Sequence, residues 1–287
     1  MRIMCYTDLT ERAHGAATVA TELAARNDDT VLLIHPGNRA EIELRATAGT
    51  ASKTVGADGN GRLREEIEYI STQGVPVKTA PLADAPARAV GEVALPARTR
   101  LVVVAASADS KSHGWRHASL AETIAENSLV PTLVVREPHS LLDWIRSGRV
   151  LRVLCAYDLS APADAALTYL TNLLRLGPCN VIVTHVGQLS DEMARLGFRS
   201  PMCFEGSEPQ VQRICEQDLR EKVDAILGAD AGVRIQYKGS WGRPDFDLVD
   251  LAKHENADLV VTGTHQWHGL DRLATCPYHA SSCGMRR

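Results

Sequence analysis

An internal repeat limits the fold of this 287-residue chain more than any other feature of its sequence. When Arg2 is placed over Arg152 with a constant offset of 150, 12 of the 36 positions from 2 to 37 are identical, without a gap. Asp8 and Asp158 are one of these identical pairs. Self-similarity of this kind is the signature of a duplicated structural unit.

The repeat resumes later at an offset of 158, where Leu-Val-Val at 101–103 aligns with Leu-Val-Val at 259–261. A chain of this length is expected to form one large or two ordinary domains. We therefore predict one domain over residues 1–137, called copy one below, and a second over residues 149–287, called copy two.

Each copy alternates short apolar, β-branched runs with segments of helical periodicity. Strands that alternate with helices imply right-handed crossovers and a parallel sheet. In copy one we expect strands at 2–6, 30–35, 75–79, 101–105 and 130–135, and helices at 13–25, 61–74, 86–95 and 119–126. In copy two we expect strands at 150–156, 181–185, 233–237 and 259–263, and helices at 162–175, 211–227 and 245–254. The predicted fold class is α/β: two tandem open parallel five-stranded sheets, Rossmann-like, with helices on both faces.

Copy two departs from this plan after Gly263, because residues 274–287 contain no counterpart of the apolar strand Val130–Val135. We therefore predict that copy two lacks its last helix and strand. The stretch 137–148 joins the copies, and its apolar residues favour a short packed helix over a free linker; they are Leu141, Leu142, Trp144 and Ile145.

The formal net charge of −4 gives no reason to expect binding to nucleic acid. No apolar run approaches the roughly 20 residues that span a bilayer, and the first strand begins almost at Met1, which leaves no room for a signal peptide. Cys5 and Cys155 lie inside predicted buried strands, which favours reduced thiols with a core role. We expect a cytoplasmic protein.

Three segments resemble the universal stress protein family in its tandem form. They are Asp8-Leu9-Thr10 and Asp158-Leu159-Ser160 after the first strand of each copy, and Ala257-Asp-Leu-Val-Val-Thr-Gly-Thr-His265 at the fourth strand of copy two. The resemblance implies an adenine-nucleotide alpha-hydrolase-like fold and a regulatory role in the stress response.

ATP-binding members of this family carry Gly, two residues, Gly, nine residues, then Gly-Ser or Gly-Thr. Such glycines let the backbone approach phosphates at a helix N-terminus. In copy one the matching positions hold Ala105, Ala108 and Ala118-Ser119, so every glycine is replaced by alanine.

Copy two keeps Gly263, but Gln266 replaces the second glycine, and the Ala280-Ser281 step comes about four residues late. The resemblance makes copy two the better candidate for ATP. It implies that Asp158 and Val186 flank the adenosine and that Gly263 faces the phosphates; the same set includes Thr264, His265, Ala280 and Ser281.

Other polar groups have plainer interpretations. His35 and His185 end equivalent strands and are expected to bond to backbone, since a proton-transfer role needs a partner acid that the sequence does not show. Asp245 and Asp247 are expected to complement a helix dipole. A cluster in the tail could bind zinc but fits no standard spacing, so no metal is expected; its members are His265, His268, Cys276, His279 and Cys283.

The sequence therefore predicts a binding or regulatory protein of the stress response, with an adenine nucleotide in copy two. Two alternatives stay open: an interaction protein without a nucleotide, and a slow ATP-hydrolysing enzyme. An enzyme is the weaker hypothesis because no nucleophile or general base is evident. We also predict a homodimer through the Val130–Val135 edge, because exposed edge strands tend to pair.

Overall fold

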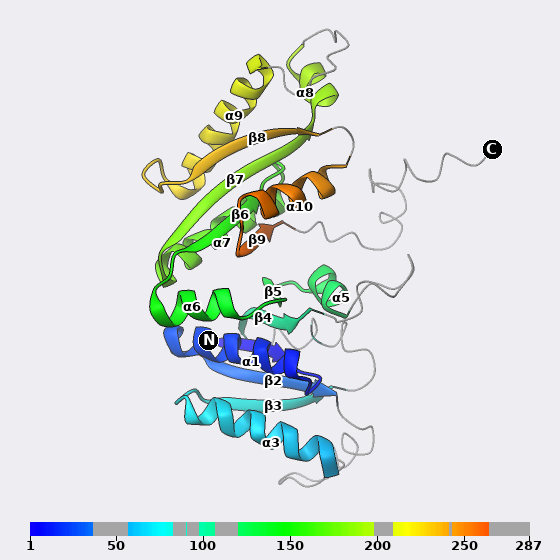
Figure 1. The fold of residues 1–287 in the computed structure, drawn as a ribbon, viewed down its shortest axis with the longest axis vertical. Helices are drawn as coiled ribbons and strands as arrows, with labels where there is room; N and C mark the ends of the chain where they lie inside the picture. The colour runs from blue at the N-terminus through cyan, green and yellow to red at the C-terminus, as the bar shows by residue number, and fades with distance from the viewer. Residues whose placement is uncertain are drawn as a thin grey trace, which may run out of the picture.

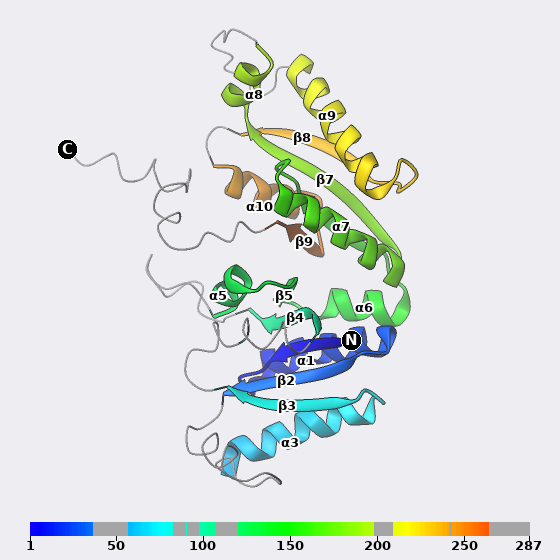
Figure 2. The same ribbon diagram turned by 180° about the vertical axis from the view of Figure 1, so that it is seen from behind.

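The computed structural model describes residues 1–36, 57–82, 90, 98–106, 120–197, 209–240 and 243–263. These residues form two parallel sheets, one in each copy, with helices on both faces (Figures 1 and 2). The first sheet has five strands in the order β3-β2-β1-β4-β5, and the second has four in the order β8-β7-β6-β9. The predicted α/β class and the tandem arrangement are confirmed.

The elements of copy one are β1 (Arg2–Tyr6), α1 (Glu11–Asn27), β2 (Thr30–Pro36), α3 (Ala57–Thr72), β3 (Val77–Leu82), β4 (Thr99–Ala105), α5 (Leu120–Asn127) and β5 (Thr132–Val135). The joining helix is α6 (His139–Ser147). The elements of copy two are β6 (Leu151–Ala156), α7 (Ala161–Leu176), β7 (Cys179–Gln188), α8 (Leu189–Arg195), α9 (Pro209–Leu227), β8 (Arg234–Ser240), α10 (Pro244–His254) and β9 (Leu259–Thr262).

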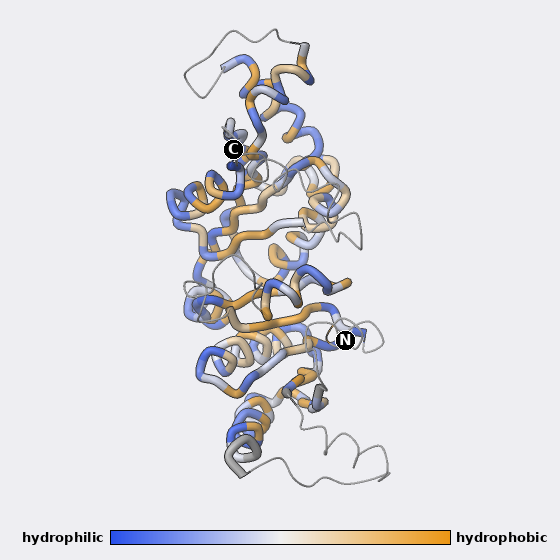
Figure 3. The backbone as a smooth tube through the Cα atoms, turned by 90° about the vertical axis from the view of Figure 1, so that its right-hand side faces the viewer, coloured by the Kyte–Doolittle hydropathy of each residue, from blue (hydrophilic) through white to orange (hydrophobic). Residues whose placement is uncertain are grey.

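The first strand of each copy is an interior strand of its sheet. Cys5 of β1 pairs with Val103, and Cys155 of β6 pairs with Val261, at matching positions. Both thiols are fully buried, as the apolar sequence around them predicted. Figure 3 shows the strands as the most hydrophobic segments, with bluer helices around them, which is the pattern expected of a sheet covered on both faces.

The helix after the first strand begins in the same way in both copies. Thr10 caps α1 by accepting a hydrogen bond from the Ala13 amide, and Ser160 caps α7 by accepting one from the Ala163 amide, each at 3.3 Å. Hydroxyl caps of this kind satisfy an amide that the helix leaves without a partner. An alanine-rich face lets α1 lie close to its sheet, with Ala16, Ala17 and Ala20 fully buried.

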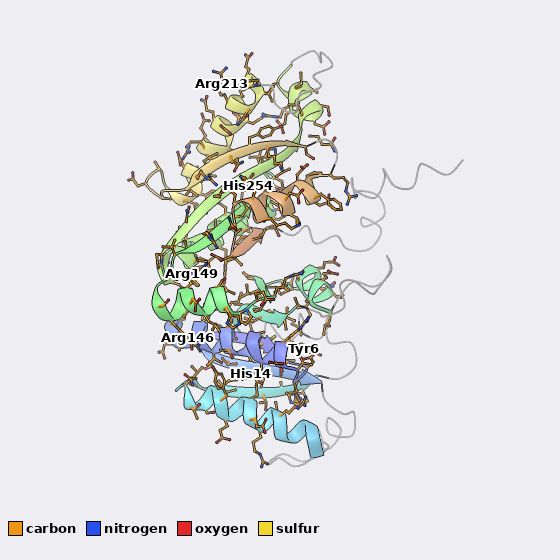
Figure 4. All side chains as sticks on the ribbon, in the orientation of Figure 1. Tyr6, His14, Arg146, Arg149, Arg213 and His254 are labelled. Carbon is orange, nitrogen blue, oxygen red and sulfur yellow. The ribbon has the colours of Figure 1, made fainter. Side chains whose placement is uncertain are left out.

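Helix α6 packs between the two copies, as its apolar residues predicted. Leu141, Trp144 and Ile145 are buried in one cluster that includes core residues of both sheets. On the side of copy one, Arg146 forms an ion pair with Glu22 at 2.6 Å, and Figure 4 shows Arg146 lying against α1. The copies therefore share one continuous hydrophobic core.

The strands follow one another along the long axis of the molecule, with β5 and β9 innermost, at the junction of the copies (Figures 1 and 2). β5 ends the first sheet and β9 ends the second among the described residues. The carboxyl ends of the strands in both sheets lie on the right-hand side of Figure 1. Ligands of open α/β sheets usually bind at this edge.

Several elements differ from the sequence prediction. Helix α8 was not predicted, since residues 189–195 follow β7 without a turn signal. β3 lies two to three residues later than expected, and β5 begins at Thr132 instead of Val130. The helix predicted at 86–95 falls outside the described residues except for Val90, which is fully buried.

Candidate functional site

Both copies place an aspartate in the same turn at the carboxyl end of their first strand. Asp8 Oδ1 accepts hydrogen bonds from the Thr10 amide at 3.1 Å and from the Thr10 hydroxyl at 2.6 Å. Asp158 Oδ1 accepts from the Ser160 amide at 3.1 Å and also from the Ser160 hydroxyl. The two aspartates thus occupy matching places, as the repeat predicted.

The residue after each aspartate has a strained backbone. Leu9 has a φ of 63° and Leu159 a φ of 64°, in the left-handed region that side chains other than glycine disfavour. Conformations of this kind persist where the surrounding structure fixes them, and they are common at ligand sites. Here the sharp turn brings the aspartate beside the N-terminus of the helix that follows.

Gly263 lies directly on the first turn of α7. A Cβ atom added to Gly263 would be 2.5 Å from the Pro162 carbonyl carbon and 2.5 Å from the Ala163 amide nitrogen. These are backbone atoms that cannot move aside, so only glycine fits at this position. Gly263, the residue that follows β9, therefore lies over the N-terminus of α7, where backbone amides and the helix dipole favour an anion.

The structure brings together three of the residues predicted for the nucleotide site. Val186 of β7 lies two residues beyond Thr184, which pairs with the end of β6. The Tyr157 amide, next to Asp158, donates to the Thr184 carbonyl at 2.9 Å. Asp158, Val186 and Gly263 therefore share one edge of the sheet. The other predicted members lie outside the described residues: Thr264, His265, Ala280 and Ser281.

His185 makes the backbone contact that the sequence predicted. It also contacts a carboxylate side chain that the sequence did not reveal. Its Nδ1 lies 2.9 Å from the Tyr157 carbonyl oxygen, so Nδ1 carries a hydrogen and donates. Its Nε2 lies 3.3 Å from Glu192 Oε1 on α8. Glu192 follows His185 by seven residues, and only the fold of α8 back onto β7 brings them together.

Glu192 belongs to a chain of charges that runs from β7 to α9. Arg195 donates to Glu192 Oε2 at 2.7 Å and forms an ion pair with Asp218 at 3.0 Å. Burial favours the neutral form of Glu192, but hydrogen bonds from Arg195 and His185 outweigh burial and lower its pKa. Glu192 is therefore an ionised structural partner, which fixes α8 over the end of β7.

The thiol of Cys215 and the phenol of Tyr237 lie beside these charged residues and are in their neutral forms. Burial raises the pKa of the Cys215 thiol to about 11, although Arg195 lies 3.8 Å from its sulfur. Burial also raises the pKa of Tyr237, whose hydroxyl has no hydrogen-bond partner among the described residues. Neither group is an activated nucleophile, since the thiolate is the reactive form of cysteine.

The described residues contain neither a group of metal ligands nor a membrane-spanning helix. In the described ranges, no three His, Cys, Asp or Glu side chains are grouped so that they could hold a metal ion. The tail cluster from His265 to Cys283 lies beyond these ranges. None of the described helices is long and apolar enough to cross a membrane.

Comparison with known proteins identifies the fold. A universal stress protein from Archaeoglobus fulgidus DSM 4304 is 15% identical over 98% of this chain and 91% of its own, with a TM-score of 0.60. A protein described as a putative universal stress protein, from Pseudomonas aeruginosa UCBPP-PA14, is 14% identical over 94% of this chain and 84% of its own, with a TM-score of 0.57. No curated protein matches the sequence. The model of the universal stress protein family matches residues 1–136 and again residues 150–275, and the chain therefore belongs to this family.

Proposed function

We propose that this protein acts in the stress response by binding an adenine nucleotide, ATP in the first instance, in copy two. The observation that carries the proposal is the contact of Gly263 with the first turn of α7, beside Asp158. It places a close-approaching backbone segment, a helix N-terminus and an acidic side chain at one sheet edge. Glycine at such a point lets backbone amides reach phosphate oxygens.

In this proposal, Asp158 and Val186 flank the adenosine, and Gly263 with Thr264 and His265 faces the phosphates. Ala280 and Ser281 belong to the same phosphate-binding set. The bound nucleotide would change how the protein binds its partners. A change of this kind requires that the nucleotide interact differently with the two states of the protein.

Copy one is the natural control for this site. Its Asp8 makes the same turn as Asp158, but Ala105 stands where copy two has Gly263. The aligned position in copy one therefore carries a Cβ atom, for which copy two has no room. We expect copy one to bind ATP much more weakly.

The two alternatives predict different results. An interaction protein without a nucleotide site would show no ATP binding in either copy. A slow ATP-hydrolysing enzyme would release phosphate in a manner that depends on Asp158. Against hydrolysis stands the engagement of His185, whose two ring nitrogens contact the Tyr157 carbonyl oxygen and Glu192. Neither nitrogen is left to activate a water as a general base.

Equilibrium dialysis with ATP tests the proposal. The wild type and Asp8→Ala should bind about one ATP per chain, whereas Asp158→Ala should bind at least about tenfold more weakly, the worth of one hydrogen bond to a charged group. Absence of binding by the wild type at millimolar ATP would overturn the proposal. Phosphate release that is equal in wild type and Asp158→Ala would exclude the enzyme alternative.

Two further parts of the proposal concern the setting of the protein. We place it in the cytoplasm, since Cys5 and Cys155 are buried inside strands and none of the four described cysteines is in a disulfide. We also propose self-association through the Val130–Val135 edge, where Val134 is 41% exposed. Light scattering at about 100 μM should then give twice the chain mass of 31.1 kDa.

A further inference from the structure

The fourth strands of the two copies share the sequence Leu-Val-Val but have different environments, and the difference marks an unassigned surface. Val102 of β4 and Val260 of β9 are equivalent, because Val102 pairs with Met4 and Val260 pairs with Leu154 of the matching first strand. Val102 is fully buried, whereas Val260 is 42% exposed. Among the residues that the structure describes, the same apolar side chain is therefore covered in copy one and open in copy two.

Copy one shows what covers this position. Ala121 and Ile124 of α5 pack in one cluster with Val102, on one face of the sheet. Beside β4, strand β5 pairs in parallel, with Val102 opposite Thr132 and Val104 opposite Val134. An extended, β-branched segment is thus the element that fits the outer edge of a fourth strand in this fold.

The open edge is continuous with an apolar face of copy two. Leu154 of β6 pairs with Val260, so both side chains lie on the same face of the sheet. On that face Leu154 packs in one cluster with Leu251 of helix α10. We call the outer edge of β9, together with the exposed Val260 side chain, the open β9 surface.

We propose that the open β9 surface binds one extended apolar segment of a partner protein, which adds to the sheet as a strand parallel to β9. Addition of a strand supplies backbone hydrogen bonds along the edge, and apolar side chains at alternate positions cover Val260. β9 and β5 are both innermost at the junction of the copies (Figures 1 and 2). In copy one the four residues Thr132–Val135 are enough to pair with β4, so one extended segment is the occupant that fits the equivalent edge of β9.

The sequence of β5 supplies a probe of the required chemistry. The nonapeptide of residues 128–136, Ser-Leu-Val-Pro-Thr-Leu-Val-Val-Arg, contains the strand that covers β4 in copy one. Its binding to the full chain can be measured by calorimetry, and protection of the β9 amides by hydrogen exchange. We expect saturable binding together with slower exchange at Leu259–Thr262.

Matched control variants distinguish strand addition at β9 from nonspecific binding of an apolar peptide. Val260→Lys should weaken binding by about tenfold or more, because a lysine on an edge strand opposes pairing. Val150→Lys replaces another valine, 50% exposed but outside the strands, and should leave binding unchanged. The L133P peptide removes a backbone donor and should bind about tenfold more weakly than the parent peptide.

Three results would overturn the proposal. Absence of saturable binding up to millimolar peptide is the first, and equal binding by the Val260→Lys protein or the L133P peptide is the second. The third is protection of the β9 amides without peptide. If that protection is independent of protein concentration, the chain covers its own edge; if it grows with concentration and mass, a second copy covers it.

Discussion

The indole of Trp144 lies directly on Gly177, at the point where α7 ends and copy two meets the joining helix. A Cβ atom added to Gly177 would be 2.6 Å from Trp144 Nε1. Trp144 is 2% exposed, and its indole nitrogen has no hydrogen-bond partner among the described residues. The close contact therefore fixes how the joining helix α6 packs on the end of α7, because no larger residue fits under the indole.

Substitution of Gly177 tests this packing. Gly177→Ala should lower the free energy of unfolding by about 1–3 kcal/mol, the usual cost of overpacking, and should shift the fluorescence of Trp144. Gly61→Ala is the control, since nothing lies within 4 Å of its added Cβ. In helix α3 it should stabilise the protein by about 0.5–1 kcal/mol. Equal urea midpoints for wild type and Gly177→Ala would contradict the account of the junction.

The ion cluster at the start of β6 and β9 predicts an acid-dependent loss of stability. Burial alone would raise the pKa of Asp258, but hydrogen bonds from Arg152 and Arg149 outweigh burial and lower it from 3.8 to about 2. A carboxyl group with a lowered pKa contributes stability above its unfolded value and loses it as the pH falls through its folded value. The contribution of Asp258 is therefore present above about pH 4 and lost toward about pH 2.

Asp258→Asn should accordingly be less stable than the wild type by about 2 kcal/mol at pH 6. The difference should shrink as the pH falls from about 4 to about 2, where the wild-type carboxyl becomes protonated. Asp230→Asn, at an exposed position, should match the wild type throughout. Urea unfolding at several pH values checks this, and a constant difference between wild type and Asp258→Asn would be the contrary result.

The strained turn after the first strand of copy two gives a third prediction. Leu159 has a φ of 64° and is 39% exposed. The effect of a substitution on stability therefore depends more on the backbone conformation than on the side-chain packing that is lost. Leu159→Asn should stabilise the protein by a few tenths to about 1 kcal/mol, since asparagine tolerates this region. Leu159→Val should destabilise it by about 1 kcal/mol or more, because a β-branched residue does not. In thermal unfolding, the melting temperature of Leu159→Asn should lie above that of the wild type, and the melting temperature of Leu159→Val should lie below it.

The link between α8 and β7 gives a fourth prediction. Glu192→Gln keeps the shape of the side chain but removes the charge that Arg195 and His185 contact. We expect a destabilisation of about 1–3 kcal/mol, typical of a lost charged hydrogen bond, and faster amide exchange confined to Leu189–Arg195. Asp191→Asn, exposed on the same helix, should leave the exchange unchanged. Uniform changes over the whole of copy two would contradict a local role.

The repeat made most of the fold predictable. An aspartate aligned at 8 and 158, followed by an apolar residue and a hydroxyl cap, predicted the same turn twice, and both turns are present. The four apolar residues of 137–148 correctly predicted α6, because free linkers rarely carry them. These features were accessible because they depend on local sequence and on comparison of one copy with the other.

The parts that could not be predicted depend on tertiary packing. Helix α8 has only seven residues and no capping side chain, so its sequence gives no start signal. The pairing of His185 with Glu192 follows from that helix and was missed with it. The need for glycine at 263 was predicted from a family pattern, but its physical cause is the approach of Pro162 and Ala163, which belong to another element.

Hydrogen exchange with and without ATP shows which of the two matching turns binds the nucleotide. We predict slower exchange at residues 157–163 and 186–188 of copy two, around Asp158 and the first turn of α7. We predict no change at residues 7–13 of copy one, where Asp8 makes the same turn. Equal protection of both turns, or protection of neither at saturating ATP, would overturn the assignment of the nucleotide site to copy two.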